Sequence, residues 1–147
     1  MIFRHRFVVR APLAAVAGFH RQPETLRAIT PFLRVQLDQV PCRLRQGDEF
    51  AFSIWLGPLP LRWRARITTL SPTGFLDRQI RGPFRFWEHR HTFVPLGAEA
   101  TLVLDEVRAA PRRHGVWAAV GFGMWLSLPL LFAFRAWKTR RLLELAR

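Results

Sequence analysis

Apolar and polar residues alternate along much of the chain, most regularly between residues 61 and 67. This stretch reads Leu-Arg-Trp-Arg-Ala-Arg-Ile, so apolar residues and arginines alternate without exception. Successive side chains of a β-strand point to opposite faces of the sheet, and the pattern therefore predicts a strand with one buried and one solvated face. The side chains expected in the interior are Leu61, Trp63, Ala65 and Ile67, and those expected in solvent are Arg62, Arg64 and Arg66.

The same period of two recurs on both sides of this stretch. The expected strands cover residues 2–9, 33–37, 50–56, 61–67, 75–80, 84–95 and 100–109. Pairs such as Gly57-Pro58 and Gly82-Pro83 separate them, as glycine and proline commonly do at turns. Two short helices are expected over 12–19 and 23–29, because each range opens with a proline, which suits the first turn of a helix. Strands at such regular spacing predict one antiparallel meander.

The C-terminal third follows a different pattern, since residues 115–134 carry no charge. A stretch of this length can span a membrane, but Pro129 would kink or break a helix in its middle. We therefore expect a helix over 129–146 that starts at Pro129 and lies on the sheet. The residues expected to follow its helical spacing are Leu131, Phe134, Lys138, Leu142 and Leu145. An interfacial membrane contact and a membrane span are the alternatives for residues 115–134.

These elements predict an α+β fold in a single domain over residues 1–147. A sheet with one apolar face must be covered, and only the terminal helix is long enough to cover it. A strongly curved antiparallel sheet around one helix leaves a gap, and gaps lined by aromatic residues are typical ligand sites. The residues expected to line this cavity are Phe52, Trp55, Trp63, Phe84, Trp87, His89, His91 and Phe134.

The chain carries a formal net charge of +13, made by 22 arginines and one lysine. Because most of these residues are spread along the chain, we interpret them as a solvated surface and expect no nucleic-acid partner. An anionic membrane surface that contacts residues 115–147 is the alternative partner. The single cysteine, Cys42, excludes an internal disulfide, and the N-terminus lacks the pattern of a signal peptide. A cytoplasmic location is expected, with peripheral membrane association as the alternative.

Polar residues that suit chemistry gather in the predicted strands. His89 and His91 lie two residues apart and so share a face, which also carries Asp77 if the turn between the strands keeps its parity. Two histidines and a carboxylate can bind a metal such as zinc or act as acid and base. We interpret them instead as a hydrogen-bonded network, with no metal, no cofactor and no firm catalytic residue. Asp105 is expected to pair with an arginine.

Residues 75–93 read Phe-Leu-Asp-Arg-Gln-Ile-Arg-Gly-Pro-Phe-Arg-Phe-Trp-Glu-His-Arg-His-Thr-Phe, and 101–107 read Thr-Leu-Val-Leu-Asp-Glu-Val. Together with Ala11-Pro12 and Ile29-Thr30-Pro31, they resemble small bacterial proteins of the SRPBCC superfamily, which is also called START-like or Bet v 1-like and includes polyketide cyclases. The resemblance covers nearly the whole chain. It implies a helix-grip fold with an internal hydrophobic cavity, and it implies no particular reaction.

The predicted function is the binding or carriage of a hydrophobic small molecule, such as a lipid, an isoprenoid or a polyketide-like compound. One alternative is a cyclase or dehydratase that uses Asp77, His89 and His91 on such a molecule. The other is a peripheral, membrane-associated lipid-binding protein that contacts lipid through residues 115–147.

Overall fold

Seven strands form one antiparallel sheet in the computed structural model, which describes residues 1–31 and 33–145. The strands are β1 (Ile2–Val9), β2 (Arg34–Gln39), β3 (Glu49–Leu56), β4 (Leu59–Ser71), β5 (Gly74–Arg81), β6 (Phe84–Pro95) and β7 (Thr101–Pro111). Their spatial order is β1-β7-β6-β5-β4-β3-β2, so each strand from β2 to β6 pairs with the next one along the chain. The predicted meander is confirmed, and β1 extends it beside β7.

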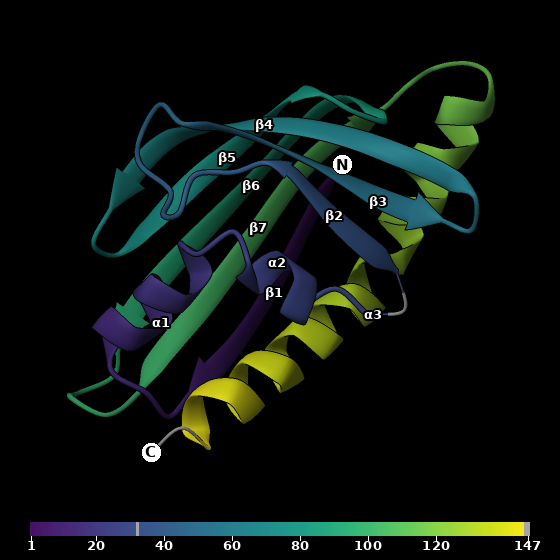
Figure 1. The fold of residues 1–147 in the computed structure, drawn as a ribbon. Helices are drawn as coiled ribbons and strands as arrows, with labels where there is room; N and C mark the ends of the chain where they lie inside the picture. Colours follow the sequence, from purple (N-terminus) through teal and green to yellow (C-terminus); the bar gives the residue numbers. More distant parts are fainter. Residues whose placement is uncertain (32, 146–147) are drawn as a thin grey trace.

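Three helices accompany this sheet within the described residues. They are α1 (Leu13–His20), α2 (Thr25–Ala28) and α3 (Val116–Glu144). Figure 1 shows the sheet curving over α3, with α1 and α2 following β1 and leading into β2. This arrangement is the helix-grip fold, and the predicted α+β class is confirmed.

The alternation of β4 divides its side chains as predicted. Leu61, Trp63, Ala65 and Ile67 are each 6% exposed or less. The three arginines between them are exposed. Apolar side chains of β4 therefore build the concave face of the sheet, and its convex face is left to charged residues.

The long helix begins at Val116, and the prediction that it begins at Pro129 is wrong. Pro129 has no N–H to donate to the carbonyl of Trp125, which weakens the helix at this point. Packing on both sides of the proline compensates, because Leu128 and Phe132 are both buried against the sheet. Figure 1 shows that the helix bends along its length, as a proline inside a helix commonly causes. The predicted last residue, 146, lies outside the described residues.

The face of α3 that packs on the sheet also differs from the prediction. Its buried residues are Gly121, Leu128, Phe132, Ala136 and Thr139. Of the residues expected on this face, Leu142 is 38% exposed and Leu145 is 74% exposed. Apolar residues occur all around the first two thirds of this helix, so their spacing fits more than one face and does not single out the buried one.

Candidate functional site: an apolar cavity with a buried polar cluster

A cavity of about 570 Å³ lies between the concave face of the sheet, the segment around α2, and α3. Its walls are mostly apolar because the strand residues that face inward are the apolar members of each alternating pattern. Representative lining residues are Leu26, Ile29, Phe52, Ile54, Leu61 and Leu131. The curvature of the sheet separates its centre from α3, and the space between them is the cavity.

Three of the aromatic residues predicted to line this cavity are in its wall. They are Phe52, Trp63 and Trp87. The ring of Trp63 stacks on Phe52 and meets Trp87 edge to face, with centroids 5.8 and 5.3 Å apart. Such ring pairs stabilise this wall by about 0.5–1.5 kcal/mol each beyond the area that they bury.

The other three aromatic residues lie elsewhere. Trp55 follows Ile54 by one residue and therefore points to the opposite face of β3, where Arg34 lies 6.0 Å from its ring. Phe84 is buried and packs beneath Trp87. Phe134 packs against Trp137 and does not belong to the lining. The sequence alone could have placed Trp55 correctly, since the alternation in β3 assigns it to the face that Phe52 and Ile54 do not share.

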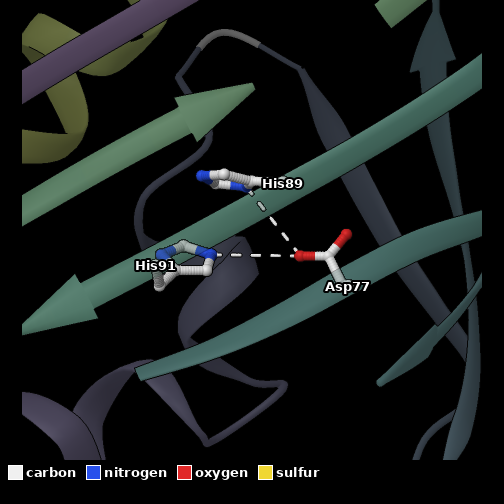
Figure 2. Close-up of side chains that lie close together, drawn as sticks. All are labelled: Asp77, His89 and His91. Carbon is white, nitrogen blue, oxygen red and sulfur yellow. Dashed lines mark ion pairs between the residues drawn. The ribbon is translucent and has the colours of Figure 1, made fainter. Parts of the chain in front are cut away.

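Asp77, His89 and His91 meet on one wall of the cavity (Figure 2). Asp77 on β5 is directly opposite His89 on β6 in the strand register, and His91 lies two residues further along. One oxygen of Asp77, Oδ2, is 3.9 Å from His89 Nδ1 and 3.9 Å from His91 Nε2. The turn at Gly82-Pro83 therefore keeps the parity that the sequence interpretation required.

Asp105 on β7 lies behind both histidines, and the prediction that it pairs with an arginine is wrong. His89 Nε2 is hydrogen-bonded to Asp105 Oδ1 at 3.1 Å. His91 Nδ1 is 2.9 Å from the same oxygen but outside hydrogen-bond geometry, so that contact is electrostatic. The arginine partners belong to Glu106 instead, which faces the outer side of the sheet and meets Arg4 and Arg108.

Burial controls the protonation of this cluster. It raises the pKa of Asp77 to about 6 and lowers the pKa of both His89 and His91, because charged forms are poorly solvated in an apolar wall. Burial alone would also raise the pKa of Asp105, but its contacts with the two imidazole rings outweigh burial and hold that pKa well below its usual range. At neutral pH the cluster therefore contains neutral histidines and a permanently ionised Asp105.

Two further residues complete the cluster and were missed by sequence reasoning. Arg135 on α3 lines the cavity and attracts both buried carboxylates, and its Nε is buried without a hydrogen-bond partner. His20 at the end of α1 places its ring 5.8 Å from that of His91. Burial, together with His91, lowers the pKa of His20 to about 4. Neither residue carries a local sequence signal, because each lies on a helix that is distant in sequence from Asp77, His89 and His91.

The cavity reaches the surface between α3 and the segment that precedes β2. Five of its lining residues are exposed and mark this opening: Gln22, Leu33, Gly123, Ser127 and Leu130. A molecule that enters here would meet apolar walls first and the polar cluster deeper inside. The arrangement suits a ligand with a large apolar body and at most a few polar atoms.

The outer face of α3 is apolar and exposed beside this opening. In the most apolar 18-residue window of the helix only 17% is buried, and by length and composition this helix could cross a membrane. The exposed apolar residues include Val116, Trp117, Phe122, Leu126, Leu130 and Trp137. Basic side chains flank this surface, with Arg112 and Arg113 before the helix, and Lys138 and Arg141 next to the ring of Trp137. We refer to these residues as the outer α3 face.

No protein-family model matches the chain, and no curated protein matches it. Solved structures do match. The Zhui aromatase/cyclase from Streptomyces sp. R1128 has a TM-score of 0.78 at 16% identity, over 98% of this chain and 93% of that one. Norcoclaurine synthase from Thalictrum flavum has a TM-score of 0.72 at 13% identity, over 100% of this chain and 88% of that one. A START superfamily protein from Mycobacterium smegmatis has a TM-score of 0.72 at 13% identity, over 96% of this chain and 98% of that one.

At identities of 13% and 16%, these likenesses concern the fold alone. The chain has the START-like fold of the SRPBCC, or Bet v 1-like, superfamily, which confirms the fold that residues 75–107 indicated. A fold of this type hosts several activities, and the fold by itself cannot choose among them.

Proposed function

We propose that this protein binds a hydrophobic small molecule in the cavity between the sheet and α3. The observation that carries the proposal is the cavity itself, with a volume of about 570 Å³ and walls built mainly from apolar side chains. Cavities of roughly 300–1,000 Å³ with apolar walls and a few convergent polar groups are typical small-molecule sites. Lipids, isoprenoids and polyketide-like compounds all match these walls.

The direct test is to purify the full chain under native conditions and identify the small molecules that it releases on denaturation. We expect mass spectrometry to find one class of mostly apolar compound in amounts comparable to the protein. A chain that releases nothing and also fails to bind neutral apolar probes would contradict the proposal.

Filling the cavity should weaken binding without unfolding the protein. Ile54 on β3 and Leu131 on α3 are partly buried lining residues. Replacing both, as Ile54→Trp with Leu131→Trp, is expected to weaken binding of the neutral fluorophore N-phenyl-1-naphthylamine at least about 10-fold, because the added rings occupy the ligand's space.

A matched control for this experiment is Ile80→Trp. Ile80 lies on β5, is 48% exposed and is outside the cavity lining, so the same change there should leave probe affinity unaltered. Circular dichroism establishes that each variant is folded. Equal probe binding by the filled variant and the control would show that the probe binds elsewhere.

A second candidate function is the cyclase or dehydratase activity on the bound molecule. The specific observation in its favour is the polar cluster in the cavity wall, since a passive container needs no buried carboxylates and histidines there. Replacing both His89 and His91 by glutamine separates the two functions. A carrier should keep its affinity for the co-purified molecule to within a few-fold. A catalyst should still bind the molecule but no longer convert it, which chromatography detects for a cyclisation that conserves mass and mass spectrometry detects for the loss of water in a dehydration.

A peripheral membrane contact is the third part of the proposal. The outer α3 face combines exposed apolar residues with flanking cations, which is the composition of helices that lie at an anionic lipid surface. Because the cavity opening is bordered by the same helix, a contact of this kind would let an apolar ligand pass between bilayer and cavity. A soluble, cytoplasmic form of the protein would then carry the ligand away from the membrane.

A further inference from the structure

Three acceptor atoms converge on one point in the cavity wall. They are Asp77 Oδ2, His89 Nδ1 and His91 Nε2, and all lie within 4.8 Å of one another. A carboxylate oxygen only accepts hydrogen bonds, and a neutral imidazole carries a single N–H on one of its two nitrogens. Whether these three atoms repel or bind therefore depends on which ring nitrogens carry hydrogen.

The position of Asp105, on the opposite side of the two rings, indicates which ring nitrogens carry hydrogen. His89 turns its other nitrogen, Nε2, to Asp105 Oδ1 in a 3.1 Å hydrogen bond, and a ring nitrogen that meets a carboxylate must be the one that donates. The other nitrogen of His91 also approaches this oxygen, at 2.9 Å. The hydrogen bond directs the lone pair of His89 Nδ1 at Asp77. For His91, a hydrogen on Nδ1 is the electrostatically favoured arrangement beside Asp105, and it directs the lone pair of Nε2 at Asp77 as well. In this arrangement three acceptors face one another across a space that a cation would occupy favourably.

We propose that Asp77, His89 and His91 bind a divalent transition-metal ion, with Asp105 orienting both rings from behind. Two imidazoles and one carboxylate form the ligand set of several zinc sites and of non-haem iron sites, which leave further positions open. Asp105 acts as the carboxylate that orients metal-binding histidines. The open positions face the cavity, where a polar group of the bound molecule would complete the coordination.

The three atoms must move closer together to bind an ion. Ligand atoms that bind Zn²⁺ at its usual bond lengths lie about 3.4 Å apart in a tetrahedral site. The two nitrogens lie 3.9 Å from Asp77 Oδ2, and all three atoms lie within 4.8 Å of one another. Metal binding therefore requires each nitrogen to move roughly half an ångström toward the carboxylate, and the two nitrogens to approach each other by up to about 1.4 Å. Arg135 already supplies one positive charge to the two carboxylates, and it is the natural competitor for the ion. This inference departs from the sequence interpretation, which expected no metal.

The test uses the full chain, freed of metal by a chelator and then titrated with Zn²⁺ or Co²⁺ alone. We expect one ion per chain, with the visible absorption bands that four- or five-coordinate Co²⁺ produces. Asp77→Asn and His91→Gln should each weaken binding by more than about 100-fold, and Asp105→Asn, which removes no ligand, by about 10- to 100-fold.

The matched controls are His114→Gln and Cys42→Ser, which remove exposed residues that bind metals non-specifically. Neither should change the affinity. If the cluster variants fail to fold, NMR of the histidine ring nitrogens in the unaltered protein decides the question, because Zn²⁺ should shift His89 Nδ1 and His91 Nε2. Binding that depends on His114, or no binding at all, would overturn the proposal.

The inference goes beyond the proposed function, and the two fail separately. N-phenyl-1-naphthylamine should bind the metal-free protein, since it needs only the apolar walls. Retained probe binding with no metal binding would reject the metal site and leave the cavity proposal intact. The converse result would reject the cavity proposal alone.

Discussion

Replacing Phe132 by alanine is expected to lower the free energy of unfolding by about 3–5 kcal/mol, the usual cost of truncating a fully buried phenylalanine. Phe132 on α3 is 1% exposed, and its ring contacts those of Phe3, His5 and His89. It therefore joins the long helix to β1 and β6 at the point where the polar cluster begins. In a protein of this length such a loss corresponds to a fall in Tm of roughly 6–20 °C.

The same helix offers a matched control. Phe122 is 53% exposed, so Phe122→Ala should change the free energy of unfolding by no more than about 0.5 kcal/mol. Chemical denaturation followed by circular dichroism measures both variants. If Phe132→Ala costs less than about 1 kcal/mol, then α3 does not pack on the sheet as described, and a helix that leaves the sheet for a membrane becomes the better explanation.

The strand positions could be predicted from the sequence because burial of one sheet face imposes a period of two. In β4 every second residue is apolar, and the structure buries those residues and exposes the arginines between them. The same rule assigns Trp55 to the face of β3 opposite to that of Ile54. Its neighbour Ile54 lines the cavity, so Trp55 had to point away.

The start of α3 could not be predicted because local and tertiary effects oppose one another at Pro129. Proline disfavours the interior of a helix by about 3 kcal/mol, which makes a helix start there the better local solution. Burial of Leu128 and Phe132 on the sheet outweighs this cost. The sequence alone indicates the cost of Pro129 inside a helix but not the tertiary contacts of Leu128 and Phe132 that offset it.

The polar cluster was predicted in part. The two-residue spacing of His89 and His91 places them on one face, and Asp77 follows from the register of a single hairpin. Asp105 and Arg135 could not be added, because the first requires the register of β6 against β7 and the second the rotation of α3 about its axis. Each step away from local geometry adds an unknown that only the folded chain fixes.

Removing two apolar residues from the outer α3 face should abolish membrane binding. The full chain is expected to sediment with vesicles of phosphatidylcholine and phosphatidylserine, and less with phosphatidylcholine alone, because the net charge of +13 favours anionic lipid. Phe122 and Leu126 are 53% and 63% exposed and do not line the cavity. The double variant Phe122→Gln with Leu126→Gln removes both side chains. Each of them contributes roughly 1.5–3 kcal/mol of apolar burial when it is fully inserted in the bilayer, so partitioning of the protein from water to the vesicles should fall at least about 30-fold.

Two residues of similar exposure outside the outer α3 face provide the control. Ile80 on β5 and Leu96 in the turn between β6 and β7 are 48% and 47% exposed, so changing both to glutamine should leave vesicle binding within about 2-fold of the original. Both double variants change only exposed side chains and should keep the cavity, which N-phenyl-1-naphthylamine binding verifies. A second copy of the chain is the competing occupant of the outer α3 face. In that case the unaltered protein would be a dimer in analytical ultracentrifugation without lipid, would ignore vesicles, and would become monomeric when Phe122 and Leu126 are replaced.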